Sequence, residues 1–146
     1  MDMAFNDFNN LAAGKIASIW GYSPGTGWQV WHSDPSIPST PNFDRFEPGY
    51  AYWVNASDSI NVVVTATKPQ PTIPQIYANT GWNLIGLAVP YPIEASTYLK
   101  SLANNCEAIY HLNPTTGILE PIQKTTNLMP GEGYWFYFNA SGVIYP

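Results

Sequence analysis

The chain has 146 residues, enough for one domain or two small ones, and 15% of them are aromatic while only 10% are charged. A typical globular chain carries roughly 25% charged residues. With five scattered Lys and Arg residues and a net charge of −5, the composition excludes a basic patch that could bind nucleic acid or an anionic membrane surface.

Further sequence features bear on the compartment. Cys106 is the only cysteine, so no intrachain disulfide can form. No apolar run approaches the roughly 20 residues of a membrane-spanning helix, and we expect no membrane insertion. The first residues lack the basic start and apolar stretch of a signal peptide. We therefore expect a cytoplasmic protein or a fragment of a longer secreted chain.

The N-terminal half is predicted to begin with a helix and to continue as short strands. Apolar side chains recur at helical spacing at Phe5, Phe8, Leu11 and Ala12. Gly14 is the helix stop. Strands are predicted at 16–22, 28–31, 50–54 and 60–66. The turn residues Pro24-Gly25-Thr26-Gly27 join the first two strands as a hairpin.

The C-terminal half repeats this order after a proline-rich linker at 67–75, which is expected to be extended. A strand at 80–87 opens the half, and helical spacing at 93–103 predicts a helix that stops at Asn104-Asn105. Strands are then predicted at 107–112, 118–122, 133–138 and 143–145.

The two halves share a motif that indicates an internal duplication. The segment 46–53 (FEPGYAYW) returns as 128–135 (LMPGEGYW). We assign residues 1–66 to the first copy and 76–146 to the second. The first copy lacks a counterpart of the strand at 80–87. This indicates a longer tandem array with neighbouring repeats, or strands that are shared between the copies.

These elements predict a mainly β protein. Each copy is expected to form a small antiparallel sheet, sandwich- or barrel-like, with one short covering helix. The copies either pack together with pseudo-twofold symmetry or lie as beads joined by the linker.

The opening strand Gly81-Trp82-Asn83-Leu84-Ile85-Gly86 and the segment 129–135 (MPGEGYW) together resemble a repeat module of prokaryotic cell-surface, S-layer-like secreted proteins. That module has a "GWNL(I/V)" opening and a "PGxGYW" signature. The resemblance covers almost all of the second copy and less of the first, where Tyr50-Ala51 replaces the Gly-containing pair. It implies an extracellular or cell-envelope location, an interaction or structural role, and no catalytic residues.

The tryptophans are open to two interpretations. Trp53 and Trp135 could be stacking platforms for sugars, or they could begin buried strands with each indole N–H bonded to a backbone carbonyl. We expect the second, because both copies keep the motif. Trp20, Trp28 and Trp82 are also predicted to lie in the core, because the copies keep apolar bulk at the first two.

Ligand binding is predicted near an insertion that the second copy lacks, at residues 33–42. Trp31, His32, Asp34 and Tyr22 form the predicted ligand-binding site, because loops on a rigid scaffold often carry recognition. The alternative is an ordinary proline-stiffened loop with Trp31 packed beneath it.

No catalytic residues, metal ligands or cofactors are predicted. His32 and His111 stand at non-equivalent positions, and neither has a second His or Cys at metal-ligand spacing. Asn55 and Asn139 fit the glycosylation acceptor sequence, and they can be glycosylated if the source is an archaeon or a eukaryote. Their apparently equivalent positions after the Tyr-Trp strands suit hairpin turns, which is the interpretation we prefer.

The sequence therefore favours a non-enzymatic extracellular module of a larger cell-surface protein. Its partner would be a protein or a polysaccharide, in adhesion, envelope assembly or polysaccharide binding. The alternatives are a carbohydrate-binding accessory module of a secreted hydrolase and a small glycan hydrolase that uses loop carboxylates.

Overall fold

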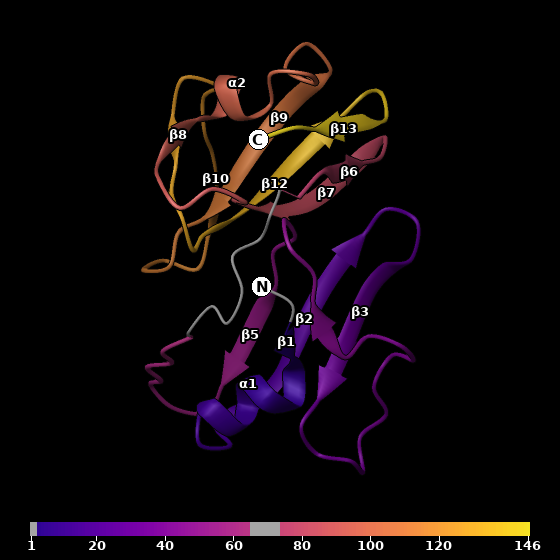
Figure 1. The fold of residues 1–146 in the computed structure, drawn as a ribbon, viewed down its shortest axis with the longest axis vertical. Coiled ribbons are helices and arrows are strands. Elements are labelled where there is room, and N and C mark those ends of the chain that lie inside the picture. The colour runs from indigo at the N-terminus through magenta and orange to yellow at the C-terminus, as the bar shows by residue number, and fades with distance from the viewer. Residues whose placement is uncertain (1–2, 65–73) are drawn as a thin grey trace.

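The computed structural model describes residues 3–64 and 74–146. It confirms a mainly β chain with small antiparallel sheets and two short helices among these residues (Figure 1). The N-terminal copy contains β1 (Met3–Ala4), α1 (Phe5–Leu11), β2 (Ile16–Ser23), β3 (Gly27–His32), β4 (Arg45–Phe46) and β5 (Trp53–Ala56). The C-terminal copy contains β6 (Ile76–Ala78), β7 (Gly81–Gly86), β8 (Ile93–Glu94), α2 (Ala95–Tyr98), β9 (Cys106–Leu112), β10 (Leu119–Pro121), β11 (Asn127–Leu128), β12 (Gly133–Phe138) and β13 (Gly142–Ile144).

The main sheet of each copy is open. The N-terminal sheet has the order β3-β2-β5, and the C-terminal sheet has the order β10-β9-β12-β7. In both, the central hairpin strand pairs with the strand of the repeated motif: Trp20 lies opposite Trp53, and Tyr110 lies opposite Trp135. The pairing of β1 with β4 likewise corresponds to that of β8 with β11. The two copies therefore repeat one backbone arrangement.

Smaller details of the two copies also agree. The pairing of β2 with β5 is interrupted between Ile16 and Ser18, and the pairing of β9 with β12 is interrupted at the equivalent place, next to Cys106. Such irregularities bend a strand and raise its twist. The hydroxyl of Tyr52 accepts the backbone N–H of Glu47 at 2.8 Å. The hydroxyl of Tyr134 accepts the backbone N–H of Met129, also at 2.8 Å.

Each copy has its own apolar core beneath its sheet. The N-terminal core is built from Phe5, Ala12, Ile16, Ile19, Trp31, Phe43 and Phe46. The C-terminal core is larger and includes Tyr98, Leu99, Ile109, Tyr134, Phe136 and Phe138. Because side chains alternate along a strand, the residues between these buried positions point to the opposite face of each sheet.

Three predicted elements differ from the structure. The strand predicted at 50–54 is displaced toward the C-terminus and forms β5, which shares only Trp53 and Val54 with the prediction. Residues 60–64 form no strand, and the rest of the strand predicted at 60–66 lies outside the described residues, as does most of the linker at 67–75. In the C-terminal copy the corresponding segment is β13, which pairs with β6. The described part of the N-terminal copy has no counterpart of β6, so residues 60–64 lack a strand to pair with. The helix predicted at 93–103 ends at Tyr98 and continues as tight turns.

β7 joins the two copies. One of its edges pairs with β12 along its whole length. Its end also bonds to the N-terminal copy: the N–H of Gly86 donates to the carbonyl of Gly49 at 3.1 Å, and the N–H of Ala51 donates to the carbonyl of Leu84 at 3.4 Å. Gly49 also packs on Ile76 of β6, because a Cβ placed there would lie 2.5 Å from that side chain. The copies are therefore in direct contact and are not separate beads.

Candidate functional site: an exposed aromatic belt

The outer faces of the two sheets carry five of the six tryptophans. The exposed fraction is 37% for Trp20, 47% for Trp28, 40% for Trp53 and 37% for Trp82. The prediction that these side chains lie in the core is therefore wrong. Strand alternation explains the result: on β2, Ile19 is fully buried, while Trp20 next to it points outward.

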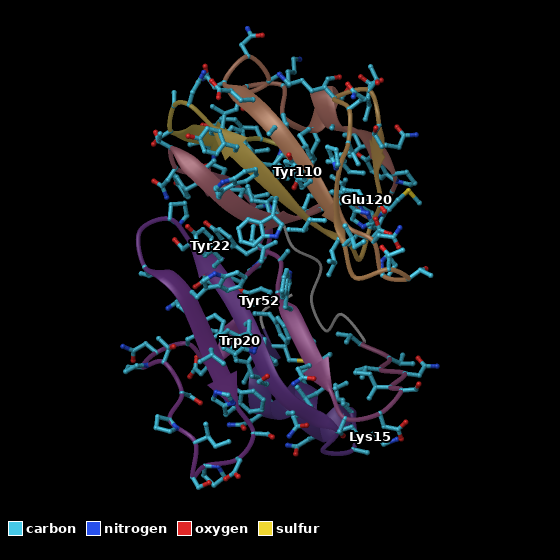
Figure 2. The ribbon with its side chains drawn as sticks, turned by 180° about the vertical axis from the view of Figure 1, so that it is seen from behind. Lys15, Trp20, Tyr22, Tyr52, Tyr110 and Glu120 are labelled. Carbon is cyan, nitrogen blue, oxygen red and sulfur yellow. The ribbon has the colours of Figure 1, made fainter. Side chains whose placement is uncertain are left out.

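Ring contacts connect these tryptophans with three tyrosines into one surface, which we call the aromatic belt. Its members are Trp20, Tyr22, Trp28, Trp53, Trp82, Tyr110, Trp135 and Tyr137. Figure 2 shows Tyr110 on the C-terminal copy, Tyr22 near the junction of the copies and Trp20 farther down the N-terminal sheet.

Trp28 is the centre of the N-terminal part of the belt. Its ring centroid lies 6.4 Å from Trp20 and 5.3 Å from Tyr22. It lies 5.6 Å from Trp53 on β5. These contacts are edge to face, the arrangement that ring quadrupoles favour. At the outer end, Trp20 donates its indole N–H to the hydroxyl of Ser18 at 3.0 Å.

Trp135 connects the N-terminal and C-terminal parts of the belt at the junction between the copies. Its ring lies 5.1 Å from Tyr22 and 5.6 Å from Trp28, so residues of β12 contact residues of β2 and β3. Its indole Nε1 is buried and has no hydrogen-bond partner among the described residues. The predicted bond from this N–H to a backbone carbonyl is therefore absent.

The C-terminal end of the belt contains an open hollow of about 280 Å³, lined by Trp82, Tyr110, Leu119 and Trp135. The ring of Trp82 meets Tyr110 at 5.7 Å and 67°, and it meets Trp135 at 6.4 Å and 83°. Tyr137 supports Trp82 from the neighbouring strand at 5.1 Å. None of the residues that line this hollow is charged.

The structure separates the four residues of the predicted ligand-binding site. Tyr22 belongs to the belt, and His32 lies beside it, 6.3 Å from the ring of Trp20. Trp31 is only 6% exposed and packs 5.9 Å from Phe5 in the N-terminal core, which agrees with the alternative interpretation of that residue. We therefore leave Trp31 out of the candidate site.

Asp34 has a local role in the loop after β3. Its carboxylate accepts the backbone N–H of Ser36 at 2.8 Å. Hydrogen bonds from the side chain and backbone of Ser36 hold the pKa of Asp34 below its usual value. The contact is an ordinary turn interaction, in which an Asp side chain bonds to the backbone two residues ahead.

The two glycosylation acceptor sequences are not structurally equivalent. Asn55 lies within β5, opposite Ser18, whereas Asn139 follows the end of β12. The residue equivalent to Asn139 is Ser57, because the N–H of Ser57 donates to Lys15 and that of Asn139 donates to Asn105. Both asparagines are exposed. The turn interpretation therefore applies to Asn139 and not to Asn55.

One cluster of titratable groups lies where β12 begins. The His111 Nε2 lies 3.1 Å from the Glu132 Oε2, and the Tyr134 hydroxyl donates to the same oxygen at 2.7 Å. Burial, together with the bond to Glu132, raises the pKa of Tyr134 to about 12. His111 and Glu132 line a hollow of about 370 Å³ beside Trp53 and Val54. Glu132 is the only carboxylate among the residues lining it, whereas a glycosidase needs a pair.

The described residues contain neither a membrane-spanning helix nor a cluster of metal ligands. No helix there is long and apolar enough to cross a membrane. No three His, Cys, Asp or Glu side chains in residues 3–64 and 74–146 lie together as metal ligands would.

The belt could not be read from residue type alone, because large apolar residues usually indicate a core. The signal that could have found it is parity along the strands. Trp20 and Tyr22 alternate with the buried Ile19 and with Gly21, and Trp135 and Tyr137 alternate with the buried Phe136.

Comparison of the chain with protein-family models, with curated proteins and with solved structures found no match in any of the three.

Proposed function

We propose that this chain is a non-enzymatic interaction module of a larger cell-surface protein, and that it binds a neutral polysaccharide through the aromatic belt. The observation that carries the proposal is the belt itself. Four tryptophans, each at least 37% exposed, are connected by ring contacts over two sheets. Large exposed apolar patches on soluble proteins commonly mark interaction sites.

The chemistry of the belt suits a partner that packs on aromatic rings and needs no charged side chain. All of its members are Trp or Tyr. Lys15 and Lys124 bond elsewhere: Lys15 pairs with Asp58, and Lys124 donates to the carbonyl of Ala103. The carbon-bound hydrogens of a pyranose ring can pack on an indole face. Indole N–H and tyrosine hydroxyl groups can bond to the sugar hydroxyls.

Two sequence features support the cell-surface setting. The chain is poor in charged residues, with 10% against 15% aromatic residues. The GWNLIG and PGEGYW segments resemble a repeat module of prokaryotic surface proteins. A carbohydrate-binding accessory module of a secreted hydrolase would use the same belt, and only the parent protein distinguishes it from an adhesion or envelope module.

The proposal can be tested by retention on polysaccharides. Soluble glucans, mannans, xylans and chitin fragments would be included in native gels, and the mobility of the protein would be compared with that of Trp28→Ala. Trp28 contacts four other belt rings, so we expect the variant to lose about tenfold or more in affinity, the scale of a hot-spot residue. Circular dichroism would check that the variant is folded.

Tyr91→Ala is the matched control, because Tyr91 is 54% exposed and makes none of the belt's ring contacts. It should bind as the wild type does. A wild-type protein that no polysaccharide retards, or a Trp28→Ala variant that is retarded equally, would contradict the proposal.

One observation favours a second candidate function, protein adhesion. The rings of the belt meet at steep angles, 62° between Trp28 and Trp53 and 83° between Trp82 and Trp135, so they form a ridged surface instead of a flat platform. Ridges of Trp and Tyr also suit the pockets of a protein partner. Self-association that rises with concentration in sedimentation and is removed by Trp28→Ala would favour this function.

A further inference from the structure

The hollow at the C-terminal end of the belt is open to solvent and mainly aromatic. Trp82, Tyr110 and Trp135 line it together with Leu119. The rings stand nearly perpendicular to Trp82, at 67° and 83°, with centroids 5.7 and 6.4 Å away. Because the rings do not lie in one plane, a group that enters the hollow can contact more than one of them.

The walls decide which chemical class can enter. They are ring and aliphatic carbon almost throughout, so a ligand that needs hydrogen bonds would lose its water without replacement, which costs free energy. A primary ammonium or a guanidinium has this problem. A quaternary ammonium group does not, because its nitrogen bears only carbon substituents and donates no hydrogen bond.

The electrostatics of the hollow also favours a cationic group. The face of an aromatic ring carries partial negative charge, and a cation within about 6 Å of the centroid is attracted to it. No Lys or Arg lines the hollow, and the net charge of the chain is −5. Among the described residues, no side chain that lines the hollow carries a positive charge that would oppose a cation.

From these features we propose that Trp82, Tyr110 and Trp135 form a binding site for a quaternary ammonium group, such as the trimethylammonium head of choline. The site goes beyond the proposed polysaccharide function, because it uses one end of the belt and requires a positive charge. Leu119 adds an aliphatic side chain to the lining. Tyr137 holds Trp82 in place from β12 at 5.1 Å.

The first test compares choline with its neutral carbon isostere, in which a tert-butyl group replaces the trimethylammonium group. Both would be titrated into the full chain at constant ionic strength, with tryptophan fluorescence or indole NMR shifts as the readout. We expect choline to bind about tenfold or more tightly, because only the cation gains from the ring faces. Equal affinities would show a merely apolar hollow, and the absence of choline binding would show no site; either result overturns the proposal.

The second test locates the site. Trp82→Leu removes one wall, while Trp53→Leu removes a similarly exposed tryptophan, 40% against 37%, from a part of the belt that does not line the hollow. Choline affinity should fall about tenfold or more in Trp82→Leu and stay unchanged in Trp53→Leu. Equal losses in both variants would place choline elsewhere and overturn the assignment.

A third experiment tests the chemistry of the walls, and polysaccharide binding measured beside it separates this proposal from the proposed function. Ethanolamine, which carries a primary ammonium group, should bind more weakly than choline, because its N–H groups find no acceptors in the walls. Equal binding of ethanolamine would contradict the argument from the walls. Polysaccharide retention, measured on the same protein samples, reports on the belt as a whole, so failure of choline binding and failure of polysaccharide binding remain distinct results.

Discussion

The two copies fill equivalent cores with aromatic rings from different elements. In the N-terminal copy Phe5, at the start of α1, is fully buried, and the equivalent residue at the start of α2 is Ala95. In the C-terminal copy Phe136 is fully buried on β12, where β5 of the N-terminal copy has the 39% exposed Val54. The copies share their backbone pairing, whereas the elements that supply the large buried rings differ. Cores tolerate such exchange when volume and pattern are kept.

On the outer faces, by contrast, the two copies keep aromatic side chains at equivalent positions. Trp20 and Tyr110 are equivalent, as are Trp53 and Trp135, and all four remain aromatic although neither core contains them. Packing in the core therefore does not explain these rings. Their retention on both sheets is the reason that we place function on the belt.

Truncating the main ring of each core should have the largest effect. Phe5→Ala and Phe136→Ala should each lower the free energy of unfolding by about 3–5 kcal/mol, since each leaves a cavity among buried rings. Hydrogen exchange should show faster opening of β2 and β5 in the first variant and of β9 and β12 in the second. Acceleration of all four strands by both variants would mean that the copies unfold as one unit.

The next largest effect is expected at two equivalent glycines, whose replacement by alanine should cost different amounts of stability. Gly49 and Gly131 both have positive φ, 86° and 85°, but only at Gly49 would a Cβ meet another side chain, Ile76 at 2.5 Å. Gly131→Ala should cost roughly 1–2 kcal/mol from backbone strain. Gly49→Ala should cost roughly 1–3 kcal/mol more, because it also overpacks the contact between the copies. Urea unfolding of the two variants measures the difference, and equal costs would argue against that contact.

Alkaline pH should weaken both copies through equivalent tyrosines. Burial raises the pKa of Tyr52 and of Tyr134 to about 12, above the ordinary value of about 10. The folded state thus favours the neutral phenols. The stabilisation is complete below about pH 10 and is lost as the pH rises toward 12. Urea unfolding at a series of pH values should show this loss.

The double variant Tyr52→Phe, Tyr134→Phe is the control for this titration. It should lose stability less steeply over the same pH interval, although Tyr98, whose pKa burial also raises to about 12, still contributes. A wild-type protein whose stability stays constant up to pH 12 would contradict the placement of these hydroxyls.

The smallest effect is expected at an ion pair that only one copy has. Lys15 Nζ lies 2.8 Å from the carboxylate of Asp58 at the surface, while the equivalent residues are Asn105 and Ala140. Lys15→Gln should leave the free energy of unfolding unchanged within error, because water screens exposed pairs. The pKa of Asp58, which the bond from Lys15 lowers, should rise toward its ordinary value in an NMR titration. An unchanged pKa would show that the pair does not persist in solution.

The strands that could be predicted from the sequence are those with strong local signals. The prediction at 133–138 matches β12, and those at 16–22 and 107–112 come within one residue of β2 and β9. Each is rich in aromatic or β-branched residues and is bounded by turn residues. The strand predicted at 60–66 had the same local composition, but a strand also needs a neighbour, and local sequence does not say whether one exists.

The candidate site was harder to predict for two physical reasons. Tryptophan is large and apolar, so its type favours a core until strand parity shows which face it occupies. Matching the two Asn-Ala-Ser segments by their letters also aligned Asn55 with Asn139. The pairing of β5 with β2 and of β12 with β9 instead makes Asn55 equivalent to Tyr137, two residues earlier. Of the residues predicted from the sequence, Tyr22 belongs to the belt, and His32, next to the insertion, lies beside it.

The hydrogen bonds that join β7 with Gly49 and Ala51 affect how strongly the belt can bind a long ligand. They set the relative orientation of the two ends of the belt when the chain folds, so a long ligand does not have to immobilise two independent halves. Association with such a preorganised surface loses less entropy. Affinity for an oligomeric ligand should therefore keep rising with ligand length until the ligand spans both copies.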